Sequence, residues 1–339
     1  MTNNFVHIGM AKTGTTFLQN VIFKSHEDVS YFGKNSNLEH INLVGKSIVT
    51  PNKKVFNAEN AKYIYQQHVD SCGARCVLYS EEILSSYLYA QPLLMAERLS
   101  MVMGDFHPIL MIREPGDWLE SMYFFRLNNL KQDAVFGFEK WLANYNSNSD
   151  TKSDIYSLNY GVTAEIYRVA SQQNKISVLF YEDFKSDREK FLLQLSEILS
   201  IDSARSLELA TLHIPSVLKD KLRINIKQAE FLWSCSYLYL GDAKQFQKVI
   251  DERLKDLNPN AVGEVANQAR DLFDSKSLCI SAWVPTIKQI TRLLGSEGSP
   301  IARLNLSSEL RDNLARNARK QQIICKAISD VKCNEWRYY

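Results

Sequence analysis

The chain has 339 residues, of which 45% are hydrophobic and 23% are charged, and its formal net charge is +2. This composition is ordinary for a globular protein with a substantial core, and it argues against disorder. Because the charge is nearly balanced, we expect neither nucleic acid nor an anionic membrane surface as the main partner.

Cysteine usage and hydropathy favour a cytoplasmic protein. The six cysteines are scattered without a close-spaced framework, which favours reduced thiols. His68, Cys72 and Cys76 follow at intervals of four, but Gly73 interrupts the helix that would align them, so no metal site is predicted. No stretch reaches the roughly 18 to 20 apolar residues of a membrane span. The first expected strand begins near Phe5, which leaves no room for a signal peptide.

Strands and helices alternate through the first part of the chain. Strands are expected from about Phe5 and at about 75–79, 108–112 and 175–181. Residues 30–57 are interpreted as a long, polar and irregular connection with at most one short helix. Helices are expected at about 15–24, 58–70, from 83, 92–103, from 115, 138–145, 164–171 and 189–199. This alternation predicts an α/β fold with a central parallel sheet and right-handed crossovers.

The last third of the chain is expected to contain helices only. Beyond about residue 215 the pattern predicts helices at about 218–257, 260–273, 284–294 and 307–331. We therefore expect an α/β core over residues 1–215 and a helical C-terminal region over residues 216–339.

The most distinctive segment is the loop after the first expected strand. Gly9 and Gly14 are followed by Thr15 and Thr16, which fits the G-x-x-x-x-G frame of a phosphate-binding loop. ATP- and GTP-binding loops carry lysine at the position of Thr15, whereas the lysine of this chain lies inside the loop, at Lys12. The sequence therefore predicts an anion site that departs from the NTPase pattern.

Two other segments are expected at the same edge of the sheet. Ser80, Glu81 and Glu82 follow the second expected strand, and Arg113 ends the third. Ser121 lies eight residues after Arg113, two turns into the next helix. Because the carboxyl ends of parallel strands meet at one edge, where such folds bind their ligands, these side chains are candidates for one site.

These motifs resemble those of sulfotransferases that use 3′-phosphoadenosine 5′-phosphosulfate (PAPS). Residues 12–16, Lys-Thr-Gly-Thr-Thr, resemble the 5′-phosphosulfate loop of that family, and residues 113–121 resemble its 3′-phosphate motif. The resemblance covers about residues 5–200 in motif order. It implies a P-loop-type three-layer fold, with PAPS bound by the core at 1–215 and an acceptor site completed by 216–339 packed on that core.

The resemblance also implies roles for individual residues. Lys12 would reach the transferred group and act in catalysis, while the 3′-phosphate would bind a guanidinium and a helix hydroxyl. The residues implied in donor binding are Lys12, Thr13, Gly14, Thr15, Thr16, Arg113 and Ser121. The alternatives for the last two are a surface ion pair of Arg113 and a solvated hydroxyl of Ser121.

A carboxylate is the implied base that takes the proton of the acceptor hydroxyl. Glu82 is preferred to Glu81, because it fits the Ser-x-Glu spacing of bacterial relatives. A carboxylate in this position can act as a base when burial and a nearby cation set its pKa. The alternative is that one or both glutamates cap the helix expected from residue 83.

Three weaker signals accompany these motifs. Residues 181–184 resemble a family segment that supports the cofactor end of the sheet, and an acidic helix cap explains them equally well. Residues 213–223 lie where relatives have a loop that closes over PAPS, although a solvated basic helix face is an equal explanation. His7 lies within the first strand and is expected to be packed rather than catalytic.

The sequence is therefore interpreted as a cytoplasmic, PAPS-dependent sulfotransferase that releases 3′-phosphoadenosine 5′-phosphate and requires no metal. A carbohydrate, a glycolipid or another hydroxylated metabolite is the expected acceptor. One alternative is an atypical P-loop kinase or NTPase using Mg-ATP, with Glu81 or Asp183 as the metal ligand, although Thr15 replaces its lysine. Another is an inactive nucleotide-binding or scaffold protein, which would be expected to have lost the lysine or the base.

Overall fold

The computed structural model describes residues 3–34, 36–52, 56–86, 92–147, 158–212, 225–255, 259–275, 279–295, 304 and 308–329. The chain forms two compact units. The first unit contains Met1–Trp118, Asn148–Asp220 and Ser307–Tyr339, and the second contains Leu119–Ser147 and Lys221–Leu306. This division does not follow a single boundary at residue 215, because each unit combines segments that are distant in sequence.

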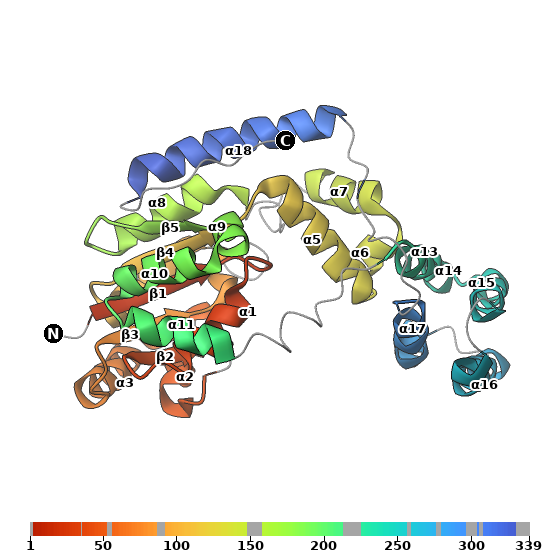
Figure 1. Ribbon diagram of the computed structural model, residues 1–339, viewed down its shortest axis with the longest axis horizontal. Coiled ribbons are helices and arrows are strands. Elements are labelled where there is room, and N and C mark those ends of the chain that lie inside the picture. Colours follow the sequence, from red (N-terminus) through yellow and green to blue (C-terminus); the bar gives the residue numbers. More distant parts are fainter. Residues whose placement is uncertain are drawn as a thin grey trace. The chain divides into compact units, whose positions relative to one another are not determined.

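A five-stranded parallel sheet forms the centre of the first unit (Figure 1). The strands lie in the order β2-β3-β1-β4-β5, and all neighbouring pairs are parallel. The predicted α/β fold with a central parallel sheet is therefore confirmed. The strand bounds are β1 Asn3–Gly9, β2 Val29–Gly33, β3 Cys76–Ser80, β4 His107–Ile112 and β5 Ser177–Phe180.

The interpretation of residues 30–57 as a long irregular connection is wrong. This part of the chain contains most of strand β2, which was not predicted, and helix α2 (Glu39–Val49), where at most one short helix was expected. Strand β2 is short, contains Ser30, and lies at the edge of the sheet, where it pairs with β3. Because its partner is distant in sequence, the pairing that makes this segment a strand is not visible in its local pattern.

One face of the sheet is covered by a helical segment after β1 and by two later helices. The segment begins with α1 (Thr15–Phe17) and continues as the π-helix η1 (Leu18–Phe23). Helices α10 (Arg188–Leu199) and α11 (Ser203–Leu212) pack on the same side, and α11 contacts η1. Alternate strand residues complete this core, among them Phe5, Tyr31, Leu78, Ile109, Met111 and Leu179.

The opposite face carries α2, α3 (Ala58–Ser71), α4 (Pro92–Met103) and α8 (Tyr160–Ala170). The ring of Tyr79 stacks on Phe32 with the ring centroids 4.7 Å apart, and its hydroxyl donates to the Gly45 carbonyl at 3.0 Å. Helices on both faces make the first unit a three-layer structure, as the sequence predicted.

The C-terminal helix α18 (Ser308–Ile328) belongs to the first unit and packs on α8 (Figure 1). The amide N–H of Gly161 donates to Gln321 Oε1 at 2.8 Å, and a Cβ on Gly161 would lie 2.6 Å from the Ile324 side chain. This close approach explains why glycine occupies position 161. The end of the chain thus contributes to the layer structure of the core.

The second unit is helical in the part of the chain that the structure describes. Its aromatic core includes Phe246, Phe273 and Trp283, with the last two ring centroids 4.6 Å apart. The helix expected over 218–257 is interrupted, and Gly241 occupies one turn with φ of 75°. The helices are α5 (Pro115–Asn128, shared with the first unit), α6 (Gln132–Val135), α7 (Phe138–Ser147), α13 (Ile226–Ser234), α14 (Ser236–Tyr239), α15 (Ala243–Lys255), α16 (Pro259–Asp274) and α17 (Ile280–Gly295).

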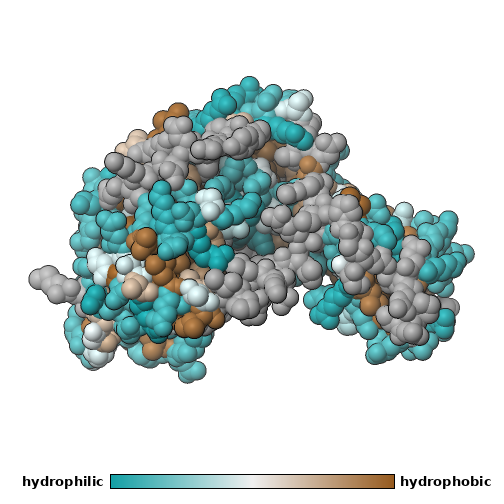
Figure 2. Space-filling view, viewed as in Figure 1, coloured by the Kyte–Doolittle hydropathy of each residue, from teal (hydrophilic) through white to brown (hydrophobic). Residues whose placement is uncertain are grey.

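Hydrophilic residues dominate the described surface on the face shown in Figure 2, with hydrophobic residues in small groups. The sequence places Trp118, Leu119, Met122 and Phe125 on one apolar stripe of the helix from residue 115. The first three are buried, whereas Phe125 is 49% exposed, so its expected place in the buried stripe is wrong. Among the described residues, no helix is both long enough and apolar enough to cross a membrane.

Candidate functional site

The loop after β1 folds back closely on the strand that precedes it. A Cβ on Gly9 would lie 2.1 Å from Thr15 Cγ2 and 2.8 Å from His7 Cε1, so there is no room for a side chain. The Thr13 hydroxyl is buried and donates to the Met10 carbonyl at 2.6 Å. These contacts hold the loop in one compact conformation.

The backbone of this loop is suited to an anion. Lys12 and Gly14 have left-handed conformations, with φ of 70° and 82°, and are separated by Thr13. Left-handed residues that alternate with ordinary ones turn successive amide N–H groups toward one concave surface. A helical segment starts at Thr15, directly after this loop, and the N-terminus of a helix also favours an anion.

Arg113 follows β4 and lies beside this loop. Its Nη1 donates to the Lys12 carbonyl at 3.0 Å, and its guanidinium lies 4.8 Å from the centroid of the Tyr181 ring. The Asp117 carboxylate is 4.0 Å away, at the limit of an ion pair. The Nε atom of Arg113 is buried and has no hydrogen-bond partner among the described residues. The guanidinium therefore retains a donor for a further acceptor.

The strand order explains why these two segments meet. The chain leaves β1 toward β2 on one side and leaves β4 toward β5 on the other. The carboxyl ends of β1 and β4 therefore flank the point where the strand order reverses, which is where open α/β sheets bind their ligands. Lys12 and Arg113 follow these two ends.

Several hydrogen bonds fix this edge of the sheet. Trp118 Nε1 donates to the Ala11 carbonyl at 2.9 Å, which ties the start of α5 to the loop. The Tyr160 hydroxyl donates to the Arg113 carbonyl at 2.6 Å. The Glu182 carboxylate, in helix α9 (Tyr181–Ser186), accepts from the Glu114 amide at 2.9 Å. Tyr181 and Glu182 thus contact this edge, while Glu182 and Asp183 also lie in the first turn of α9, so both explanations given for residues 181–184 have a structural counterpart.

Glu82 lies directly against the loop. One carboxylate oxygen, Oε1, accepts a hydrogen bond from the Thr15 hydroxyl, and the other, Oε2, is 2.7 Å from Lys34 Nζ. Glu82 begins a short 3-10 helix, η2 (Glu82–Ser85), where the sequence predicted a helix from about residue 83. The structure thus brings together one predicted loop residue, the preferred carboxylate and a lysine that the sequence analysis did not single out.

Glu81 has a different environment from Glu82. Burial raises the pKa of Glu81 above its ordinary value of 4.5, while the positive charge of Lys34 acts in the opposite direction. The two adjacent carboxylates are therefore distinguished by their surroundings, one by burial and the other by direct contacts to Thr15 and Lys34.

Replacing Glu81 by glutamine is expected to raise the melting temperature at pH 7. Because the folded-state pKa is raised, ionised Glu81 costs stability once the pH exceeds that value, and this cost disappears below the unfolded value near 4.5. The difference between Glu81→Gln and the wild type should therefore shrink as the pH falls from 7 to 4. Thermal melts across this range test it, with the exposed Glu97→Gln as control. A difference in melting temperature that stays constant with pH would contradict the raised pKa of Glu81.

His7 is buried within β1, as expected. Its Nδ1 is 2.7 Å from the Ser80 hydroxyl oxygen, which also accepts from Gln19 Nε2 at 3.0 Å. Burial lowers the pKa of His7 to about 3, so the imidazole is neutral at physiological pH. This packing links β1, β3 and η1 just below the loop.

Two further predictions concern other parts of the chain. Ser121 is half-buried in the part of α5 that belongs to the second unit, and its role remains a prediction. Residues 213–223, the expected closing loop, lie outside the described residues. Within the described ranges, no group of three or more histidine, cysteine or acidic side chains is arranged to hold a metal ion.

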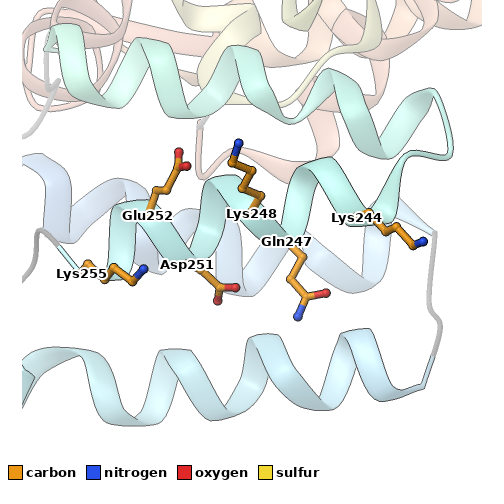
Figure 3. A pocket seen from close by; sticks show the side chains of 6 residues that line it. All are labelled: Lys244, Gln247, Lys248, Asp251, Glu252 and Lys255. Atoms are coloured by element: carbon orange, nitrogen blue, oxygen red, sulfur yellow. The ribbon is translucent and has the colours of Figure 1, made fainter.

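The second unit carries an open pocket (Figure 3). It is lined by side chains of α15 alone, namely Lys244, Gln247, Lys248, Asp251, Glu252 and Lys255. The mixed charges and the single-helix lining are typical of a solvated helix face. No predicted site residue lines it.

The fold is that of an α/β protein with a central parallel sheet, and the loop after β1 has a backbone suited to an anion. No family model matches the chain, and no curated protein matches it. Among solved structures, it is similar to a sulfotransferase from Alicyclobacillus acidocaldarius, with 16% sequence identity and a TM-score of 0.44. The match covers 74% of this chain and 96% of the other.

Proposed function

We propose that the protein transfers the sulfuryl group of PAPS to a hydroxyl of an acceptor. The observation that carries the proposal is the meeting of three segments at one edge of the sheet. The loop backbone at Lys12 accepts from Arg113 at 3.0 Å, and the loop hydroxyl of Thr15 donates to Glu82. The loop whose backbone suits an anion thus lies beside the guanidinium of Arg113 and the carboxylate of Glu82.

The donor would be held by its two phosphate-bearing ends. The loop amides, including those of Thr13, Gly14, Thr15 and Thr16, suit the 5′-phosphate. The guanidinium of Arg113, with its buried and unused Nε, suits the dianionic 3′-phosphate, and Ser121 is proposed as a further donor to it.

The proposed chemistry is an in-line displacement at sulfur. Glu82 takes the proton of the acceptor hydroxyl, whose oxygen forms a bond to sulfur as the bond between sulfur and the 5′-phosphate oxygen breaks. Lys12 and the loop amides stabilise the negative charge that develops on the leaving phosphate. The products are the sulfated acceptor and 3′-phosphoadenosine 5′-phosphate.

The proposed acceptor is a carbohydrate, a glycolipid or another hydroxylated metabolite. The helical residues 216–339 are proposed to take part in its binding, while residues 1–215 bind the donor. Incubation of the protein with PAPS and a panel of hydroxylated sugars, followed by mass spectrometry, would identify a substrate by the mass of one added sulfuryl group.

Thermal shift measurements test the proposed donor without an acceptor. A ligand that binds the folded state raises the melting temperature by mass action. We expect stabilisation by 3′-phosphoadenosine 5′-phosphate that exceeds the effect of ATP with Mg²⁺. A larger effect of ATP with Mg²⁺ would favour the kinase or NTPase alternative, and no shift with the bisphosphate at saturation would exclude the proposed donor.

A further inference from the structure

Hydrogen bonds hold the backbone of Lys34, just after β2, on both its amide and its carbonyl side. Gly33 has φ of 121°, and a Cβ there would lie 2.2 Å from the Ser80 carbonyl oxygen, so the ends of β2 and β3 are in close contact. The Lys34 amide donates to the same carbonyl at 3.3 Å, and the Tyr31 hydroxyl donates to the Lys34 carbonyl. Asn42 Oδ1 accepts from the Gly33 amide at 2.9 Å. The turn therefore presents Lys34 in a fixed place.

The side chain of Lys34 extends toward the phosphate-binding loop. Its Nζ lies 2.7 Å from Glu82 Oε2, and the side chain is 43% exposed. The other oxygen of the same carboxylate accepts from the Thr15 hydroxyl. A single carboxylate group therefore separates the ammonium group from the loop, and the exposed part of the side chain can still contact a ligand.

We propose that Lys34 binds the sulfuryl group of the donor while it positions the carboxylate of Glu82. The proposal rests on the proposed function, in which the acceptor hydroxyl lies between Glu82 and sulfur. The sulfuryl oxygens then face the groups that surround Glu82, and Lys34 is in direct contact with its carboxylate. Lys12 would contact the same group from the side of the loop.

The consequence is that the protein binds PAPS in preference to 3′-phosphoadenosine 5′-phosphate. PAPS carries the sulfuryl group and 3′-phosphoadenosine 5′-phosphate does not, so a residue that binds this group strengthens the binding of PAPS alone. A charge-assisted hydrogen bond to a half-exposed lysine corresponds to about fivefold to tenfold in affinity. Lys34 would thus favour the replacement of bound 3′-phosphoadenosine 5′-phosphate by PAPS after transfer.

Calorimetric titration of PAPS and of 3′-phosphoadenosine 5′-phosphate, without acceptor, tests the proposal. For Lys34→Met we expect binding of PAPS to weaken about fivefold to tenfold, with binding of the bisphosphate unchanged. Lys34→Arg, which keeps the charge, should restore most of the difference. Lys46→Met, at an exposed position of α2, is the matched control and should bind both ligands like the wild type.

Each other outcome has a defined meaning. If Lys34→Met binds both ligands equally more weakly, or binds both as the wild type does, the proposed role of Lys34 is wrong and the proposed function still stands. Failure of the wild type to bind either ligand would overturn the proposed function, and this proposal with it. Circular dichroism identifies variants that do not fold, and Lys34→Gln replaces Lys34→Met in that case.

Discussion

Replacing Lys12 by alanine is expected to lower kcat for sulfuryl transfer by about 10²-fold to 10³-fold, the usual loss when one preorganised donor to a developing charge is removed. Breakage of the bond between sulfur and the 5′-phosphate oxygen leaves negative charge on the phosphate that the loop would hold. Lys12 already has φ of 70°, so alanine adds no backbone strain that lysine lacks. Initial rates with PAPS and an acceptor identified by screening measure the effect.

A matched control separates this effect from a general change of charge. Lys24 is exposed at the end of the helical segment that begins at Thr15, and Lys24→Ala should retain the wild-type rate. The melting temperature of each variant shows whether the fold is intact. Full activity of a folded Lys12→Ala protein would remove Lys12 from the proposed mechanism.

Sequence analysis predicted those strands whose own residues show a strand pattern without reference to their partners in the sheet. Strands β3 and β4 are continuous apolar runs, and every residue of β3 is buried. Strand β2 was missed because its pairing with β3 decides its structure. Helix α9 was missed because it starts at Tyr181, directly after β5, without a side-chain cap to mark its beginning.

The candidate site was predictable only in outline. Parallel strands bring their carboxyl ends to one edge, so the loop residues, Glu82 and Arg113 could be placed together without knowing the strand order. The contact between Thr15 and Glu82 requires β3 to lie beside β1, which the sequence does not specify. Lys34 was missed with the strand that positions it, and a lysine directly after a short apolar run was the only available signal.

Replacing Glu82 by glutamine is expected to lower kcat by about 10²-fold to 10⁴-fold, the usual contribution of a general base. The amide oxygen of glutamine can still accept from the Thr15 hydroxyl, but the side chain no longer takes a proton or pairs with Lys34. Binding of 3′-phosphoadenosine 5′-phosphate should persist, because the donor is held by other groups. Single-turnover rates with PAPS, together with thermal shifts, separate the two effects.

The comparison with Glu81→Gln decides which carboxylate is the base. If Glu82 is the base, Glu81→Gln retains much more activity than Glu82→Gln, and Glu97→Gln, on the exposed face of α4, retains all of it. The opposite order of the two losses would assign the proton transfer to Glu81 and limit Glu82 to orienting Thr15 and Lys34.

The pH dependence of the wild-type rate provides an independent criterion. A base must be ionised, so the rate falls as the pH drops through its pKa. Because burial raises the pKa of Glu81, a rate governed by Glu81 would begin to fall at a higher pH than a rate governed by an ordinary glutamate. If that acidic limb is present in the wild type and unchanged in Glu81→Gln, it belongs to another group, and the carboxylate in contact with the loop at Thr15 remains the candidate.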